Sequence, residues 1–252
     1  MQTYNPAINS VISSLGLRNA ARHIYWLLCR PRNGVIKAKV HNRSPLFAAR
    51  DVVELRTVEL ALRSERNWLT LLCRALRPDD LFLDVGANLG IFSVTAALCG
   101  AKVVACEPGR TALERLRRNV AINALSDKVK IVEAALSNRT GNCTFTEPSA
   151  DSVIQTGHIG GGTEVHMLRG DDLGISPTVI KIDVEGHEIE VLDGLKDSLR
   201  GVRMCLVERH AGVAQADILQ CLTTAGLVPE DAGDGRISAL RTSLAASPTA
   251  IR

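Results

Sequence analysis

Aromatic residues are scarce in this sequence: Phe, Trp and Tyr together make up 3% of its 252 residues. Proteins that hold single-stranded nucleic acid stack the bases on aromatic side chains, so this shortage disfavours such a role. No stretch reaches the roughly eighteen uninterrupted apolar residues typical of a membrane-spanning helix. Residues 1–6 carry no basic region followed by an apolar core. A secretion signal is therefore not expected, and the predicted location is the cytoplasm.

Cysteine pairs of the C-x-x-C type are also missing, and such pairs are the usual mark of a zinc site. Several cysteines sit in apolar runs, which predicts buried, unbonded thiols in a reducing compartment. The seven cysteines of the chain are Cys29, Cys73, Cys99, Cys106, Cys143, Cys205 and Cys221.

Acidic residues are few at the start of the chain. Residues 1–80 contain 13 Lys and Arg against 6 Asp and Glu, a net charge of +7, whereas the remainder contains 17 against 21, a net charge of −4. We interpret the basic segment as solvated faces of surface helices. An anionic partner, such as a phosphate-bearing carrier or a membrane surface, stays open.

What the sequence does contain is a strand, a glycine turn and a helix in succession. Leu81–Val85 predicts a buried strand, 86–90 is glycine-rich, and Ile91–Leu98 predicts a helix packed on a sheet. Gly86 permits backbone angles that other residues avoid and lets a ligand approach the main chain. The unpaired N–H groups in the first turn of the helix would point at that ligand. The stretch therefore predicts a cradle for a nucleotide-like molecule.

The spacing of the turn differs from that of dinucleotide-binding folds. From Asp84 to Gly90 the pattern is D-x-G-x-x-x-G, in place of G-x-G-x-x-G. A second acid, Glu107, ends the next predicted strand, 23 positions after Asp84. An acid at that strand end can accept hydrogen bonds from both hydroxyls of a ribose. The two acids suit a ligand with a cationic amino-acid end and a ribose, and S-adenosylmethionine fits that description.

The expected cofactor contacts follow successive strand ends. The glycine turn should hold the amino-acid end of S-adenosylmethionine, Glu107 the ribose, and the end of the third strand the adenine. The predicted residues are Asp84, Gly86, Ala87, Asn88 and Gly90 for the amino-acid end, Glu107 for the ribose, Glu133 and Ala134 for the adenine, and Asp183 as a further candidate for the ammonium group.

These residues resemble the FkbM family of S-adenosylmethionine-dependent methyltransferases. The resemblance runs from about residue 81 to about residue 227, and its most specific block is K-I-D-V-E-G-H-E at 181–188. The other blocks lie at 84–90, 107–108 and 119–123. The resemblance implies a Rossmann-like fold and transfer of a methyl group to a hydroxyl of a sugar, a glycoside or a polyketide-like metabolite. The acceptor would be a small molecule or a carrier-linked one.

From residue 80 onward strands and helices alternate regularly, which predicts an α/β fold with a doubly wound parallel sheet. We divide the chain into an N-terminal helical and hairpin extension (1–78), an S-adenosylmethionine-binding methyltransferase domain (79–245) and a loose tail (246–252). Strands are expected near 81–85, 102–106, 129–133, 178–183 and 203–208, helices near 90–99, 110–124, 187–199 and 213–224, and an antiparallel closing pair near 226–228 and 236–240.

The extension should contain two helical pieces over 7–30 separated at Gly16, a hairpin over 35–48 and an apolar helix over 58–76. We expect it to pack over the cofactor end of the sheet, as a lid, a substrate surface or a dimer surface. Residues 136–178 show no long helical pattern. Extra strands near 143–146, 152–154 and 164–168 and a flexible loop are therefore expected beside the cofactor, where substrates bind.

Methyl transfer to an aliphatic hydroxyl requires alignment and removal of the hydroxyl proton by a base or a metal ion. The predicted catalytic residues are Asp183, at the end of the fourth strand, and Glu208 and His210, at the end of the fifth. A carboxylate at the position of Asp183 is costly to bury unless it is paired or liganded, although it could also cap a helix. His210 is the expected general base, because an unperturbed imidazole has a pKa of about 6.5. Metal ligands stay unassigned; oxygen ligands here would suit magnesium.

Other functions stay open at this point. An RNA 2′-O-methyltransferase would use a Lys-Asp-Lys-Glu tetrad; Asp183 and Glu208 match its acids, but Lys181 is expected to point away and Lys196 lies late in its helix. The missing G-x-G-x-x-G pattern argues against an NAD-dependent oxidoreductase. The acids and histidines at two strand ends argue against a non-catalytic binder of adenosine ligands. A homo-oligomer also stays open.

Overall fold

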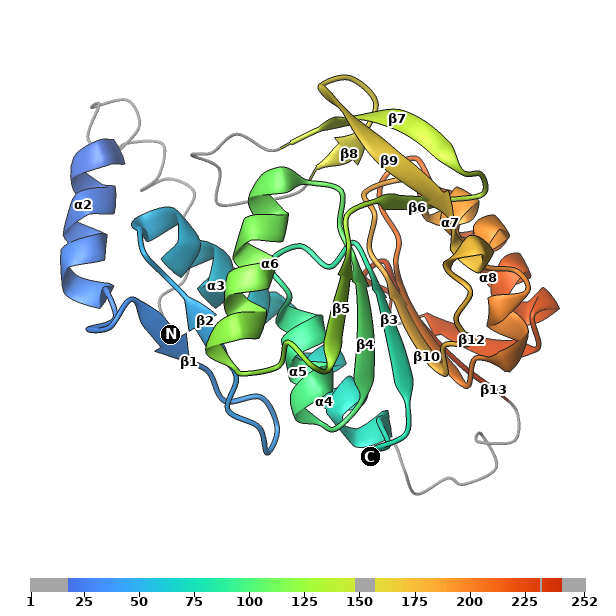
Figure 1. Ribbon diagram of the computed structural model, residues 1–252, viewed down its shortest axis with the longest axis horizontal. Coiled ribbons are helices and arrows are strands. Elements are labelled where there is room, and N and C mark those ends of the chain that lie inside the picture. Colours follow the sequence, from blue (N-terminus) through green and yellow to red (C-terminus); the bar gives the residue numbers. More distant parts are fainter. Residues whose placement is uncertain (1–17, 148–156, 232, 242–252) are drawn as a thin grey trace.

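The computed structural model describes residues 18–147, 157–231 and 233–241, arranged around a seven-stranded sheet (Figure 1). Five strands of this sheet are parallel, and two antiparallel strands close one edge. The order is β12-β13-β11-β10-β3-β4-β5, formed by β3 (Leu81–Val85), β4 (Lys102–Cys106), β5 (Val129–Val132), β10 (Val179–Ile182), β11 (Met204–Glu208), β12 (Leu227–Asp231) and β13 (Arg236–Arg241). The predicted α/β class, its strands and its closing pair are confirmed.

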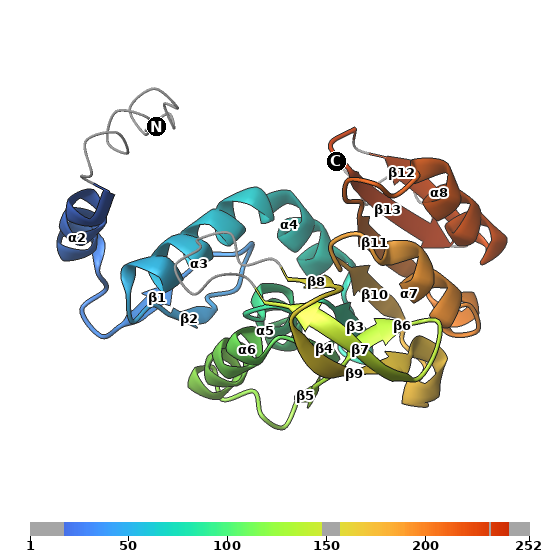
Figure 2. The ribbon, with the colours of Figure 1, turned by 90° about the horizontal axis from the view of Figure 1, so that it is seen from above.

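Helices cover both faces of the sheet (Figure 2). One core joins Phe82 and Val103 of the sheet to α4, α5 and α6, and the other joins Leu83 and Ile180 to α7 and α8. The bounds are α4 (Arg66–Ala75), α5 (Ile91–Leu98), α6 (Arg110–Ile122), α7 (Glu188–Gly194) and α8 (Gln215–Thr224). Alternate side chains of each strand thus point to opposite faces of the sheet. No helix within the described residues is long and apolar enough to cross a membrane.

The chain changes direction across the sheet between β3 and β10. Strands β4 and β5 follow β3 outward on one side, whereas β11 follows β10 on the other. In open α/β sheets a crevice forms at such a point, outside the carboxyl ends of the strands. This topology brings the ends of β3, β4, β10 and β11 together.

The described part of the extension consists of α2 (Arg18–Cys29), a hairpin of β1 (Val35–Lys37) and β2 (Leu46–Ala48), and two helices, α3 (Val52–Ser64) and α4. The prediction of a single helix over 58–76 was wrong. Asp51 accepts hydrogen bonds from Val53 N and Glu54 N and so starts α3 earlier. Glu65, at φ −88° and ψ 4°, leaves the helical region and separates α3 from α4. Residues 7–17, including Gly16, lie outside the described residues.

This extension covers a face of the sheet. The expectation that it packs over the cofactor end of the sheet was wrong. Its side chains Phe47, Val58, Leu69 and Leu72 belong to the same core as Phe82. None of the described residues before β3 lines the pocket at the carboxyl ends of the strands. Two side chains of the extension, Glu65 and Trp68, contact Arg236 at the start of β13, near the carboxyl end of β11.

Asn119 of α6 fastens the hairpin to the glycine turn. Its buried side chain accepts from Ala48 N at 2.9 Å and donates to Leu89 O at 2.8 Å. Asn119→Ala is expected to lower the free energy of unfolding by about 1–3 kcal/mol, because two buried backbone groups lose their partners. Denaturant titration checks this, with Asn142→Ala as the control, since Asn142 makes only exposed contacts. Equal losses in the two variants would contradict the prediction.

A second sheet lies across the carboxyl end of the central sheet (Figure 1). Its order is β6-β9-β7-β8, formed by β6 (Ala135–Ser137), β7 (Gly141–Thr146), β8 (His158–Ile159) and β9 (Thr163–Arg169). The predicted extra strands around 143–146 and 164–168 are therefore confirmed, whereas 152–154 lies outside the described residues.

Candidate functional site

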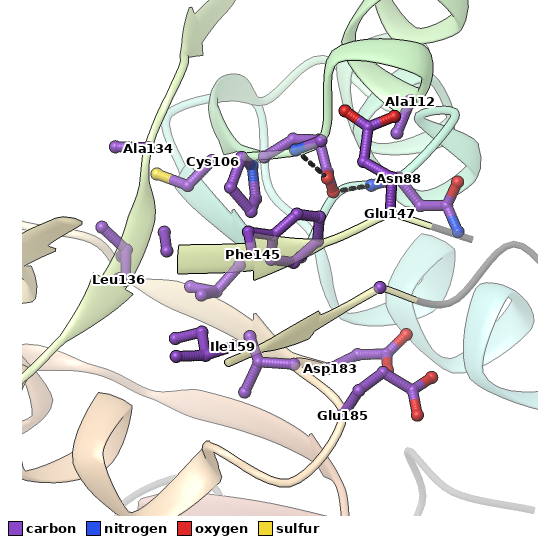
Figure 3. A pocket seen from close by; sticks show the side chains of 18 of the residues that line it. Asn88, Cys106, Ala112, Ala134, Leu136, Phe145, Glu147, Ile159, Asp183 and Glu185 are labelled. Carbon is purple, nitrogen blue, oxygen red and sulfur yellow. Dashed lines mark hydrogen bonds between the residues drawn. The ribbon is translucent and has the colours of Figure 1, made fainter. Parts of the chain in front are cut away.

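A pocket opens between the strand ends of the central sheet and the second sheet (Figure 3). Five of the predicted cofactor residues line it: Gly86, Asn88, Glu107, Ala134 and Asp183. Its further lining residues are Val85, Cys106, Pro108, Gly109, Thr111, Ala112, Ala135, Leu136, Phe145, Glu147, Gly157, Ile159, Val184 and Glu185. The pocket thus contains Glu107, one acid of the predicted pair, and part of the glycine turn.

Four predicted residues are not among those that line the pocket: Asp84, Ala87, Gly90 and Glu133. Asp84 is fully buried behind the turn and accepts a hydrogen bond from Ser93 Oγ at 2.5 Å. Burial raises the pKa of its carboxyl group. The Glu133 side chain is 61% exposed and pairs with Arg117 instead of facing the pocket. A direct contact of these four with a cofactor stays a prediction.

Glu107 stands at the end of β4, where the ribose was predicted. Its carboxylate accepts from Asn88 N and from Gly109 N, both at 2.8 Å. Burial raises the pKa of Glu107 to about 7, although these two backbone hydrogen bonds act to lower it. Each oxygen still has a second lone pair, so the carboxylate can also accept from two ribose hydroxyls.

The turn after β3 is held against the end of β10. Gly86, Asn88 and Gly90 have φ angles of 74°, 50° and 88°, in the left-handed region that glycine adopts readily. A Cβ atom on Gly86 would lie 1.9 Å from the carbonyl oxygen of Asp183. The glycine at 86 is therefore required by the protein's own backbone as well as by any ligand.

Lys181 does not point away from the site, so that expectation was wrong. Its ammonium group donates to Gly86 O at 3.1 Å and to Asp183 Oδ2 at 3.0 Å, and lies 3.8 Å from Asp84 Oδ1. Burial alone would lower the pKa of Lys181, but Asp183 and Asp84 outweigh it and raise the pKa. Because alternate residues of a strand share a face, Lys181 and Asp183 lie on the same side of β10. Lys181 stays charged and ties the glycine turn to Asp183.

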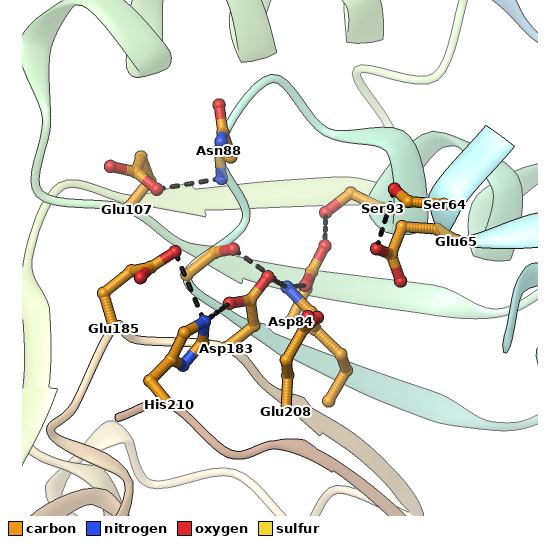
Figure 4. Close-up of polar contacts among 12 residues, drawn as sticks. Ser64, Glu65, Asp84, Asn88, Ser93, Glu107, Asp183, Glu185, Glu208 and His210 are labelled. Carbon is orange, nitrogen blue, oxygen red and sulfur yellow. Dashed lines mark hydrogen bonds and ion pairs between the residues drawn. The ribbon is translucent and has the colours of Figure 1, made fainter. Parts of the chain in front are cut away.

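His210 meets three carboxylates after the end of β11, and Figure 4 shows two of them, Asp183 and Glu185. Its Nδ1 lies 2.7 Å from Glu188 Oε1, and its Nε2 lies 3.4 Å from Glu185 Oε1 and 3.7 Å from Asp183 Oδ1. Burial lowers the pKa of His210, but the hydrogen bonds with Glu185 and Glu188 outweigh it and raise the pKa to about 10. The reason for expecting a general base, a pKa of about 6.5, therefore does not hold in this environment.

Glu208 ends β11 beside Asp183 and Lys181 (Figure 4). Its Oε1 lies 3.7 Å from Arg236 Nη2, which also contacts Glu65 Oε1 at 2.8 Å. Burial raises the pKa of Glu208 to about 7, with further contributions from Asp183 and Glu65. Glu208 is thus a carboxylate that can take up a proton near neutral pH, and Glu65 of the extension helps to hold its partner Arg236.

Sequence reasoning missed several residues of the site. Phe145 of β7 forms one wall of the pocket, and a Cβ atom on Gly157 would lie 2.3 Å from its ring. Glu147 accepts from Arg110 N at 2.7 Å and from Thr111 Oγ1 at 2.8 Å, which caps the start of α6. Glu185 lines the pocket as well. For Phe145 and Glu147 the signal in the sequence was the strand pattern of 136–178, which predicted the location but not the side chains. Glu185 belongs to the K-I-D-V-E-G-H-E block, but the sequence indicated no separate role for this residue.

Comparisons with known proteins identify the family of this chain. Residues 84–229 match the family profile described as Methyltransferase FkbM domain. A curated relative, the hexuronic acid methyltransferase AglP of Haloferax volcanii, is 33% identical over 227 residues, which cover 85% of this chain and 91% of the relative.

Two solved structures are also similar to this chain. The methyltransferase FkbM of Methylobacillus flagellatus KT superposes with a TM-score of 0.50 at 16% identity over 73% of this chain, which spans about half (54%) of that protein. A precorrin-6y C5,15-methyltransferase of Geobacter metallireducens GS-15 has a TM-score of 0.47 at 16% identity, over 71% of this chain and 88% of that one. The first supports a Rossmann-like methyltransferase fold. Together with the profile match and the curated relative, the site places this chain in the FkbM family of S-adenosylmethionine-dependent methyltransferases.

Proposed function

We propose that the chain transfers a methyl group from S-adenosylmethionine to a hydroxyl of a uronic-acid-like sugar unit, free or linked to a carrier. The name of its 33% identical relative supports this acceptor class, since the relative methylates a hexuronic acid. The observation that carries the reaction type is the arrangement of Asp183 and Glu208 at the ends of adjacent strands, beside a pocket that Asp183 lines.

The residues of the pocket fit the cofactor. Glu107 offers a buried carboxylate for the ribose hydroxyls, and Gly86 brings main chain to the pocket wall. Phe145, Leu136 and Ala134 supply apolar surface suited to an adenine ring. When bound, S-adenosylmethionine supplies an activated methyl group. The chain must align the acceptor with that group and exclude water.

The chain must also accept the proton of the acceptor hydroxyl. We assign this role to Glu208, because Lys181 remains protonated and both ring nitrogens of His210 face carboxylates, so neither nitrogen is free to take the proton. Asp183, fixed by Lys181 at 3.0 Å, is placed to hold the hydroxyl at the edge of the pocket. A divalent ion at Asp183 would assist the same step by making the bound hydroxyl more acidic.

Incubation with radiolabelled S-adenosylmethionine and a panel of sugars tests this function. Glucuronic and galacturonic acid glycosides, their neutral counterparts and lipid-linked forms should be included, with macrolides as non-sugar acceptors. We expect label on a uronic-acid sugar in a base-stable methyl ether. A base-labile methyl ester would place the methyl group on the carboxylate and overturn the hydroxyl assignment. Label on macrolides alone would overturn the sugar class.

Glu107→Gln should weaken S-adenosylmethionine binding by about 1.5–3 kcal/mol, because the ribose hydroxyls lose a charged acceptor. The loss corresponds to roughly a 10- to 150-fold higher Kd. Calorimetry checks it, with Glu133→Gln as the control, since Glu133 pairs with Arg117 away from the pocket. Unchanged affinity in Glu107→Gln would remove Glu107 from the ribose site.

The same residue predicts a pH effect on stability without cofactor. Burial raises the pKa of Glu107 in the folded chain from 4.5 to about 7, so the folded state binds more protons than the unfolded state between these values. Its contribution to stability is present below the lower pKa and is lost as pH rises through the higher one. Compared with wild type, Glu107→Gln should therefore gain stability from pH 4.5 to 7, as measured by denaturant titration. A pH-independent difference would contradict this.

Two further proposals concern the setting of the protein. We place it in the cytoplasm, because free cysteines such as the buried Cys106 and Cys205 suit a reducing compartment. Cell fractionation with an antibody tests the location. A homo-oligomeric state stays a prediction, which light scattering can check.

A further inference from the structure

Three side chains from two strand ends converge at the edge of the pocket. Asp183 follows β10, Glu185 lies in the next turn, and His210 follows β11. One ligand atom from each lies within 4.8 Å of the other two. Asp183 and Glu185 also line the pocket, so anything bound between the three side chains would touch the space for the reacting groups.

The imidazole of His210 is oriented in the way that metal-binding histidines are. Its Nδ1 lies 2.7 Å from Glu188 Oε1, and Glu188 is fully buried and also accepts from Gly186 N at 3.1 Å. A carboxylate on one ring nitrogen fixes the ring and leaves the other free for a metal ion. That other nitrogen, Nε2, faces Glu185 Oε1 at 3.4 Å and Asp183 Oδ1 at 3.7 Å.

Negative charge is in excess around these side chains. Two buried carboxylate oxygens, Glu188 Oε2 and Asp84 Oδ1, accept no hydrogen bond from any residue that the structure describes. Asp84 still has Lys181 as an ionic partner and Glu188 has His210, but a buried carboxylate oxygen that accepts no hydrogen bond is costly. The carboxylates are Asp84, Asp183, Glu185, Glu188 and Glu208, against the cations Lys181, Arg236 and, in the metal-free chain, His210. A divalent cation would relieve this excess.

We propose that Asp183, Glu185 and His210 bind a divalent first-row metal ion such as Mn²⁺, with Glu188 as the positioning residue for His210. The ion takes the place of the proton on His210 Nε2, and this proton is released to the solvent. Two carboxylates and an imidazole form a mixed oxygen and nitrogen set, which suits Mn²⁺ better than the oxygen-preferring Mg²⁺. The role of the ion rests on the proposed function: at the edge of the pocket it would bind the acceptor hydroxyl and make it more acidic.

Titration of the purified full-length chain with Mn²⁺ alone tests the site, with free Mn²⁺ measured by electron paramagnetic resonance. Wild type should bind one ion, and Glu185→Gln and His210→Ala should each raise the Kd at least tenfold. Glu188→Gln should raise the Kd 10- to 100-fold, as is usual when the carboxylate behind a metal-binding histidine is changed. Glu190→Gln is the matched control, because Glu190 contacts His187 outside the cluster. Thermal unfolding confirms that each variant is folded.

The proposal is overturned if wild type, Glu185→Gln and His210→Ala bind Mn²⁺ equally well. It is also overturned if wild type binds no ion at millimolar Mn²⁺. The sugar assay separates this failure from failure of the function. If chelated protein that binds no Mn²⁺ still methylates a sugar fully, the proposed function is supported and the metal site is contradicted. If Mn²⁺ binds at this site but no sugar becomes labelled, the metal site is supported and the proposed acceptor class is contradicted.

Discussion

Gly86→Ala is expected to lower the free energy of unfolding by about 2–5 kcal/mol and to abolish S-adenosylmethionine binding. The new Cβ atom would lie 1.9 Å from the carbonyl oxygen and 2.9 Å from the carbonyl carbon of Asp183. Both are backbone atoms at the end of β10, so no side-chain rotation relieves the collision. Overpacking of this kind costs about 1–3 kcal/mol, and a non-glycine residue at a φ of 74° adds roughly 1–2 kcal/mol.

The loss of binding follows from the same displacement. The turn at Gly86 and the carboxylate of Asp183 both line the pocket, and Lys181 ties them together through Gly86 O and Asp183 Oδ2. A displacement of the turn at Gly86 therefore also displaces the carboxylate of Asp183. Calorimetry and thermal unfolding measure the two effects, with Gly141→Ala as the control, since a Cβ atom there meets nothing within 4 Å. A Gly86→Ala variant with wild-type melting temperature and affinity would contradict the close packing described here.

The central sheet was predictable because its pattern is local. Runs such as Leu81–Val85 and Val179–Ile182 are apolar except for one charged residue each and are buried on both faces, as is usual for parallel strands between helices. Glycine and proline mark their ends. The break of the apolar stretch at Glu65 was missed because nothing local signals it: Glu65 turns toward Arg236, 171 positions away.

The site was predictable only as far as the strand ends. Glu107 and Asp183 line the pocket because each stands at the carboxyl end of a parallel strand, whereas Glu133, also at a strand end, faces Arg117. The sequence does not give the side-chain direction there. Phe145 and Glu185 line the same pocket, but their roles depend on where a second sheet and a turn fold back, which no spacing in the sequence reveals.

The chemistry of His210 was the least predictable feature. From the sequence it is a histidine with an ordinary pKa. In the folded chain it lies among Asp183, Glu185 and Glu188, which come from another strand end and the start of α7. The approach of three carboxylates raises its pKa to about 10 despite burial. The charge of His210 is thus set by tertiary contacts, and this is why we propose Glu208 as the proton acceptor.

Glu208→Gln should therefore lower kcat by roughly 10²- to 10⁴-fold, the usual contribution of a general base, while the Kd for S-adenosylmethionine stays unchanged. The amide keeps the shape of the side chain but cannot take the proton of the acceptor hydroxyl. Single-turnover kinetics with saturating cofactor measures the effect, and calorimetry measures the affinity. Because Glu208 also contacts Arg236, a loss of activity could arise from a displaced arginine.

Glu65→Gln separates these two causes. Glu65 holds the same Arg236 at a shorter distance, 2.8 Å against 3.7 Å for Glu208, but it belongs to the extension and does not stand at a strand end. If Glu208 is the base, Glu65→Gln keeps most of the turnover and Glu208→Gln does not. Equal losses in the two variants would show that the pair acts only by positioning Arg236, and the base would then have to be Asp183. A large loss in Glu208→Gln alone, with the melting temperature unchanged, is the result that the geometry at the ends of β10 and β11 leads us to expect.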